Sequence, residues 1–134
     1  MYFDDVNWAA VVVIAILNIV LGMLWYSPQV LGKAWLEFMH FQESDCKCTV
    51  WHMVGGFISA LITAWVLALF IDLAAAVTLQ EGLKVGFFAW LGFVATTHFS
   101  GVLWAKKPWQ AYLIDSGFYL VFFLIAGGIL GVWH

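Results

Sequence analysis

Four long apolar segments follow one another along the chain, with shorter and more polar connections between them. They run from Val6 to Trp25, from Trp51 to Ile71, from Leu83 to Trp104 and from Tyr112 to Trp133. A helix needs about 20 mostly apolar residues to cross a bilayer core. The pattern therefore predicts an all-α fold, an integral membrane four-helix bundle forming a single transmembrane domain over residues 1–134, with helices at about 6–25, 51–71, 83–104 and 112–133.

The connection between the first two segments has a helical pattern of its own. Ser27 and Pro28 are a typical helix start. Apolar residues then recur at helical spacing, at Val30, Leu31, Ala34, Trp35, Phe38 and Met39. We predict a short amphipathic helix at about 29–41 that lies in the membrane interface.

The composition agrees with a membrane chain and excludes some functions. The sequence is 65% hydrophobic and 10% charged, against roughly half and a quarter in soluble domains. Its basic residues are five lysines without an arginine, so we exclude nucleic acid as a partner. The first segment follows the acidic stretch 1–5 and is longer than the apolar part of a signal peptide. We expect it to remain as an anchor.

Tryptophan and lysine positions predict how the bundle sits in the membrane. Four of the five lysines lie in the first and third connections, which places these connections in the cytoplasm and both termini on the opposite side. Tryptophan prefers the two membrane interfaces. The predicted interface anchors are Trp8, Trp25, Trp35, Trp104, Trp109 and Trp133.

Small residues recur every four positions on three of the segments, and helices in lipid pack closely at such residues. We interpret these rows as packing surfaces, either within one chain or between copies of it. The predicted helix-packing residues are Gly56, Ala60, Ala64, Gly92, Thr96, Gly127 and Gly131.

Several longer motifs carry a family resemblance. They are residues 24–28 (Leu-Trp-Tyr-Ser-Pro), 31–35 (Leu-Gly-Lys-Ala-Trp), 90–97, 107–109 (Lys-Pro-Trp), 114–119 and 127–133. In these motifs, over nearly its whole length, the chain resembles the bacterial family of small membrane proteins catalogued as domain of unknown function 1761. The resemblance implies a four-helix protein of the bacterial cytoplasmic (inner) membrane and implies no activity. Relatives tend to have Arg-Pro where this chain has Lys107 and Pro108.

Polar side chains inside the membrane are costly unless they have a partner. Counted from the lysine-bearing ends of the segments, those of this chain fall at similar depths, roughly 5 to 12 Å. We predict one polar intramembrane cluster in the cytoplasmic half, in which His98 lies near Asp115. Its predicted members are Asn18, Ser59, Thr97, His98, Asp115 and Tyr119.

Two interpretations of this cluster stay open. The side chains either fill polar gaps between helices, or His98 and Asp115 form a protonatable pair that binds a proton, a cation or a polar head group. His98 could also ligate a haem or a chlorin, although no second histidine lies at an obviously matching depth. On balance we expect no cofactor.

Histidine and cysteine also gather in the first connection. Two thiols and two imidazoles could hold zinc, but the Cys-x-Cys spacing is tighter than that of the usual zinc sites. We expect unligated thiols there. The candidate metal ligands are His40, Cys46, Cys48 and His52.

No nucleophile arrangement, phosphate-binding loop or paired carboxylates suggest an enzyme, so we expect a non-catalytic protein. The leading hypothesis is a multi-pass bundle that acts by helix packing, as a homo-oligomer or as an accessory subunit of a larger membrane complex. Its partners are then the lipid bilayer and either itself or another membrane protein. The alternatives are small-solute, proton or cation binding or transport through the polar cluster, and cofactor binding through His98.

Overall fold

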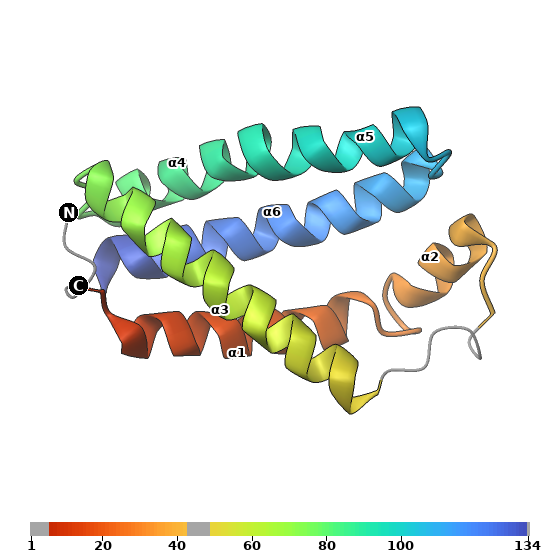
Figure 1. Cartoon of the computed structure of the whole chain (residues 1–134), viewed down its shortest axis with the longest axis horizontal. Helices are drawn as coiled ribbons and strands as arrows, with labels where there is room; N and C mark the ends of the chain where they lie inside the picture. The colour runs from red at the N-terminus through yellow and green to blue at the C-terminus, as the bar shows by residue number, and fades with distance from the viewer. Residues whose placement is uncertain (1–5, 43–48, 134) are drawn as a thin grey trace.

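The fold was examined in a computed structural model, which describes residues 6–42 and 49–133. Four helices in this part of the chain are long and apolar enough to cross a membrane, and the described residues contain no strand. They are Trp8–Trp25, Val50–Leu73, Leu79–Trp104 and Trp109–Val132. The predicted all-α fold with four spans is confirmed (Figure 1).

The third span is not a regular α-helix throughout. It consists of an α-helix, a short π-helical turn and a second α-helix. In chain order the elements are α1 (Trp8–Trp25), α2 (Gly32–Met39), α3 (Val50–Leu73), α4 (Leu79–Trp90), the π-helical turn η3 (Leu91–Ala95), α5 (Thr96–Trp104) and α6 (Trp109–Val132).

Capping residues set the helix starts, and hydropathy alone misplaces two of them. The third span begins at Leu79, four residues before the expected start. The Thr78 hydroxyl accepts from the backbone N–H of Glu81 (3.2 Å), and the Glu81 carboxylate accepts from that of Val77 (2.8 Å). The fourth span begins at Trp109, because Pro108 directly before it has a preset backbone. The interfacial helix is shorter than expected, since α2 covers only Gly32–Met39.

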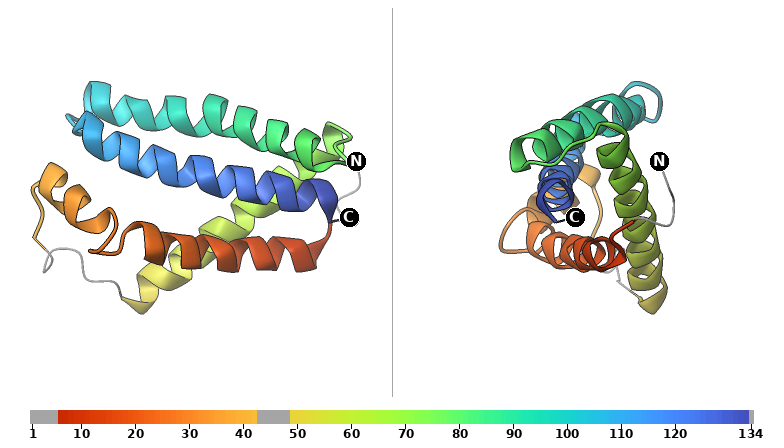
Figure 2. Two further views of the ribbon diagram at one scale, coloured as in Figure 1. Left: turned by 180° about the vertical axis from the view of Figure 1, so that it is seen from behind. Right: turned by 90° about the vertical axis from the view of Figure 1, so that its left-hand side faces the viewer.

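Helix α6 is the central element of the bundle. It packs against α1, α2, α3, α4 and α5, and it contributes the most buried residues of any helix. Figure 1 shows it between α4 and α1, while α3 crosses the bundle obliquely, and the end-on view of Figure 2 agrees. Its Phe122 is fully buried beside Val11 and Ile14 of α1 and Leu67 of α3. Each of the other spans therefore packs at least in part against α6.

Glycines bring the backbones of α4 and α6 into direct contact. A Cβ on Gly82 would lie 2.1 Å from the carbonyl oxygen of Gly127, and one on Gly86 would lie 2.3 Å from that of Phe123. On Gly131 it would lie 2.5 Å from the carbonyl oxygen of Thr78. The predicted packing residues Gly127 and Gly131 lie in this contact. Their partners Gly82 and Gly86 were not predicted.

The other predicted small-residue rows differ in their surroundings. Ala60 and Ala64 of α3 are buried, and Gly56 faces Ile19 of α1. Gly92 and Thr96, by contrast, are exposed, and a Cβ on Gly92 would meet nothing within 4 Å. A side chain at position 92 would therefore meet no described part of the chain.

The predicted interface anchors fall into two groups. Trp8, Trp104, Trp109 and Trp133 lie at the ends of the spans with exposed side chains, as an anchor requires. Trp25 and Trp35 are half-buried instead. Trp25 hydrogen-bonds to α6, and the Trp35 ring packs edge-on against Tyr26. These two rings join helices together.

Candidate functional site

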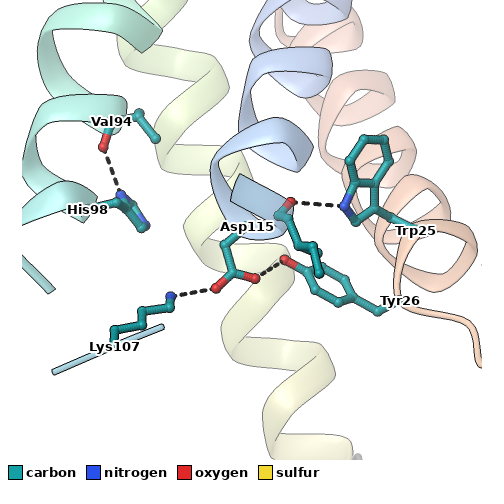
Figure 3. Close-up of polar contacts among 7 residues, drawn as sticks. Trp25, Tyr26, Val94, His98, Lys107 and Asp115 are labelled. Carbon is teal, nitrogen blue, oxygen red and sulfur yellow. Dashed lines mark hydrogen bonds and ion pairs between the residues drawn. The ribbon is translucent and has the colours of Figure 1, made fainter. Parts of the chain in front are cut away.

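Asp115 of α6 lies at the centre of a polar group that joins three segments of the chain. Its Oδ2 atom lies 2.5 Å from the Lys107 ammonium, and its Oδ1 atom accepts a hydrogen bond of 2.5 Å from the Tyr26 hydroxyl. The side chains of Asp115 and Lys107 are 14% and 23% exposed. Figure 3 shows both contacts. Each carboxylate oxygen thus has its own donor, and we call these three residues the Asp115 clasp.

A tight turn after α1 delivers Tyr26 to the clasp. Within it, Leu31 N donates to Trp25 O (3.2 Å), and Gly32 N donates to Ser27 O (3.0 Å). A Cβ on Gly32 would lie only 2.0 Å from the carbonyl oxygen of Tyr26, so this turn requires glycine. The Trp-Tyr-Ser-Pro motif and Gly32 therefore build the same turn.

Trp25 fixes the same end of α1 against α6. Its indole N–H donates to the carbonyl oxygen of Ile114 at 3.0 Å (Figure 3). Its ring lies over Gly117, where a Cβ would be 3.3 Å from the indole, and it packs against Phe118 with ring centroids 6.3 Å apart. Gly117 thus leaves room for the indole to reach the α6 backbone.

The turn between α5 and α6 delivers Lys107. Lys106 has a left-handed backbone (φ 57°), which reverses the chain directly after α5. The backbone N–H groups of Ala105 and Lys107 both donate to the carbonyl oxygen of Gly101, at 3.1 and 3.0 Å. Lys107 therefore points back along the bundle toward Asp115, which lies in the second turn of α6.

Side chains satisfy the backbone around the π-helical turn η3. A π turn interrupts the regular i to i−4 ladder and is often found at functional sites. Four consecutive carbonyl groups here each pair with a side chain. The pairs are Thr96 Oγ1 with Gly92 O (2.7 Å), Thr97 Oγ1 with Phe93 O (2.6 Å), His98 Nδ1 with Val94 O (3.0 Å) and Tyr112 Oη with Ala95 O (2.8 Å).

Asp115 pairs with Tyr26 and Lys107 and not with His98, the partner expected from the sequence. His98 Nδ1 contacts the carbonyl oxygen of Val94 instead (Figure 3). A carbonyl only accepts, so His98 Nδ1 donates this hydrogen bond. The His98 ring packs against Tyr119, with centroids 5.3 Å apart. His98 and Asp115 thus lie on neighbouring helices but belong to separate hydrogen-bonded groups.

The remaining predicted cluster residues do not join the clasp. Ser59 and Thr97 are exposed, and the Thr97 hydroxyl bonds to its own helix. Asn18 is half-buried, and none of its hydrogen bonds in the described part of the chain reaches the clasp. The sequence analysis missed Tyr26 and Lys107 as members. Both lie inside the motifs that carry the family resemblance, which was the available signal.

The candidate metal ligands of the first connection are only partly described. Cys46 and Cys48 lie outside the described residues. The backbone N–H of Thr49 donates to His52 Nδ1 (3.1 Å) at the start of α3, and His40 is exposed at the end of α2. Residues 6–42 and 49–133 contain no group of three or more metal-ligating side chains. In the described part of the chain, His52 therefore caps a helix.

The Tyr26 phenol lies outside the spans and has a perturbed acidity. Burial, together with the hydrogen bond to the Asp115 carboxylate, raises its pKa above the ordinary value of 10.0. Its folded form thus holds the proton more tightly than the unfolded chain does. The contribution of Tyr26 to the free energy of unfolding is fully present below pH 10. It falls as the pH rises further, because the phenol of the unfolded chain ionises first.

We expect the Tyr26→Phe variant to lose part of this alkaline fall in the free energy of unfolding. At neutral pH it should be less stable by about 1.5 kcal/mol, since it lacks one hydrogen bond to a charged group. Unfolding in detergent at several pH values measures both effects. Tyr112→Phe is the control, and it should keep the alkaline fall because its Tyr26–Asp115 bond is intact. An identical alkaline fall in Y26F and the wild type would contradict the assignment.

The clasp lies within the part of the chain that matches a known family model. Residues 9–131 match the model of a family described as "Protein of unknown function (DUF1761)". Searches of curated proteins and of solved structures gave no match. The match covers nearly the whole chain, from α1 through α6. The chain therefore belongs to the family of domain of unknown function 1761.

Proposed function

We propose that this protein acts without catalysis, as a membrane-embedded bundle that packs against a further copy of itself or against another membrane protein as its accessory subunit. The observation that carries the proposal is the bare face of the third span. Gly92, Thr96 and Ser100 follow one another at four-residue spacing and are all exposed. Helix α5 contributes no buried residue. A row of small residues on such a face lets another helix approach closely.

The polar groups near Asp115 support the same role. The two Asp115 oxygens, His98 Nδ1, and the indoles of Trp25 and Trp90 all bond within the chain. The bonds of Asp115, Trp25 and Trp90 tie different segments together, that of His98 stays within the third span, and together they leave few polar atoms for a solute. This favours packing over proton, cation or small-solute binding at the cluster. A haem or chlorin on His98 Nε2 stays an alternative proposal, because histidine ligands often donate their other ring nitrogen to a backbone carbonyl.

We further propose that the protein resides in a bacterial inner membrane with the end that holds Lys33, Lys106 and Lys107 on the cytoplasmic side. Lysine is enriched on that side of membrane proteins. Lys84 lies in the first half of α4, which begins at the opposite end, where α1 begins and α6 ends (Figure 1). Both termini would then be on the non-cytoplasmic side.

The Gly92→Leu variant tests the packing role. A Cβ at position 92 meets nothing within 4 Å, so the bundle should fold while the added side chain blocks close approach by a partner. We expect association between differently labelled copies, or with a co-purifying subunit, to weaken about tenfold, which corresponds to about 1.4 kcal/mol. Energy transfer between labelled copies, and pull-down from native membranes, measure this.

Gly55→Leu is the matched control. Gly55 lies on α3 and its Cβ position is equally free within the chain, but it does not belong to the row on the third span. We expect G55L to associate like the wild type. Unchanged association of G92L with every partner found would contradict the proposal.

A further inference from the structure

The start of α1 and the ends of α3 and α6 border a cavity, and Figure 1 shows these helix ends together at one end of the bundle, with the turn before α6 at the other end. The cavity holds about 220 Å³. Its lining comes from the start of α1, the end of α3, the connection to α4 and the end of α6. The lining includes Asn7, Leu69, Asp72, Val77, Leu130 and Trp133.

Asp72 is the acidic residue among those that line this cavity. Its carboxylate forms no ion pair within residues 6–42 and 49–133, where the one salt bridge joins Lys107 to Asp115. Lys84 lies at the same end of the molecule but lines a different groove, beside Phe70 and Phe88. The charge of Asp72 is therefore free to attract a cation from outside the chain.

The ends of the surrounding helices add to this negative potential. Both α3 and α6 end at the cavity, and neither has a basic residue in its last turn. A helix C-terminus carries roughly half a negative charge. The positive helix ends nearby are capped from within the chain, α1 by the Asn7 side chain (3.1 Å to Ala10 N) and α4 by Thr78 and Glu81. The Glu81 carboxylate also brings a second negative charge to Val77 at the rim.

The walls of the cavity have both apolar and polar surface. Ala68, Leu69 and Leu130 line it beside the Asp72 carboxylate. A metal ion such as Ca²⁺ takes about six to eight oxygen ligands, and the described residues contain no group of three or more His, Cys, Asp or Glu side chains that could hold one. An organic cation gains from the Asp72 carboxylate and from the apolar side chains, since its charged group contacts the carboxylate and its carbon atoms contact the apolar walls.

We propose that this cavity binds the ammonium group of an organic amine through Asp72. The same chemistry is offered by a soluble amine and by the ethanolamine head group of a phospholipid. The site is independent of the packing role proposed above, since it shares no residue with the row on the third span.

The test uses the full chain in nanodiscs of phosphatidylglycerol, a lipid that has no ammonium group. Soluble ethanolamine is titrated while tryptophan fluorescence is followed, because Trp133 lines the cavity. In a second arm, phosphatidylethanolamine is added and the lipid retained by the protein is counted by native mass spectrometry. Binding of the soluble amine identifies a small-molecule site, and retention of the phospholipid alone identifies a head-group site.

Two variants and a control decide whether the cavity is responsible. Asp72→Asn should weaken binding of whichever probe binds about tenfold, as expected for the loss of one charge-assisted hydrogen bond. Ala68→Leu should reduce binding by filling the cavity while Asp72 remains. Glu37→Gln removes an exposed carboxylate on α2 at the opposite end and should change nothing. The proposal is overturned if neither probe binds saturably to the wild type, or if D72N or A68L binds as tightly as the wild type.

Discussion

Replacing Gly82 with leucine is expected to be the most destabilising single change in the described chain. The new Cβ would lie 2.1 Å from the carbonyl oxygen of Gly127, and a backbone atom cannot rotate away as a side chain can. The two helices must therefore separate along their whole contact, from Gly82 and Gly86 to Gly131. We expect the free energy of unfolding to fall by about 3 kcal/mol or more, measured by unfolding in mixed detergent micelles.

The control for this prediction is the same exchange at Gly92. Here a Cβ has free space, and leucine is a better helix former than glycine by about 0.8 kcal/mol. G92L should thus be as stable as the wild type or slightly more stable. If G82L and G92L had the same free energy of unfolding, the close contact between α4 and α6 would be wrong.

Asp115→Ala is expected to have the second-largest effect. It leaves the Lys107 ammonium and the Tyr26 hydroxyl without their acceptor in a partly buried place. Breaking a buried pair in this way costs about 3 to 5 kcal/mol, and the partial exposure of both side chains places our expectation near the lower figure. Unfolding of the variant in detergent gives the value, and Glu37→Ala, which removes an exposed carboxylate on α2, should change stability by less than about 0.5 kcal/mol.

A double-mutant cycle separates the ion pair from other effects of this change. Lys107→Ala and Asp115→Ala together should cost less than the sum of the two single changes, because the second change removes no further contact. Additive effects would mean that the two side chains do not interact. Tyr26 is unchanged in all three variants, so the cycle reports on the contact between Lys107 and Asp115 alone.

The clasp explains why lysine suits position 107 in this chain. Arginine favours a bidentate contact that occupies both oxygens of a carboxylate. Asp115 offers only Oδ2, because Oδ1 already accepts from Tyr26. A point-like ammonium therefore matches the acceptor that remains, and an arginine would compete with the Tyr26 hydroxyl.

The spans themselves could be predicted because each is a long apolar segment. Their ends could not, since hydropathy does not register the cap at Thr78 or the preset backbone of Pro108. The same limit hid Gly82, which lay one residue before the predicted start of its helix. Its role depends on Gly127, a partner that only the folded arrangement of α4 and α6 brings into contact.

The partners of Asp115 illustrate a different limit. Depth in the membrane drew attention to this residue, but depth does not say which way a side chain points. Tyr26 is 89 positions away in the sequence, and it reaches Asp115 through the turn that Gly32 permits. Lys107 reaches it because Lys106 adopts a left-handed backbone. Such local chain reversals are not visible in a hydropathy pattern.

The central claim, that the bundle works by packing against a further membrane subunit, is tested most directly by native mass spectrometry. The untagged wild-type protein would be released from its native membrane in a gentle detergent and its mass measured without further separation. We predict an assembly heavier than one chain, either a homo-oligomer or a complex with another membrane protein. A strictly monomeric species without a partner would contradict the account.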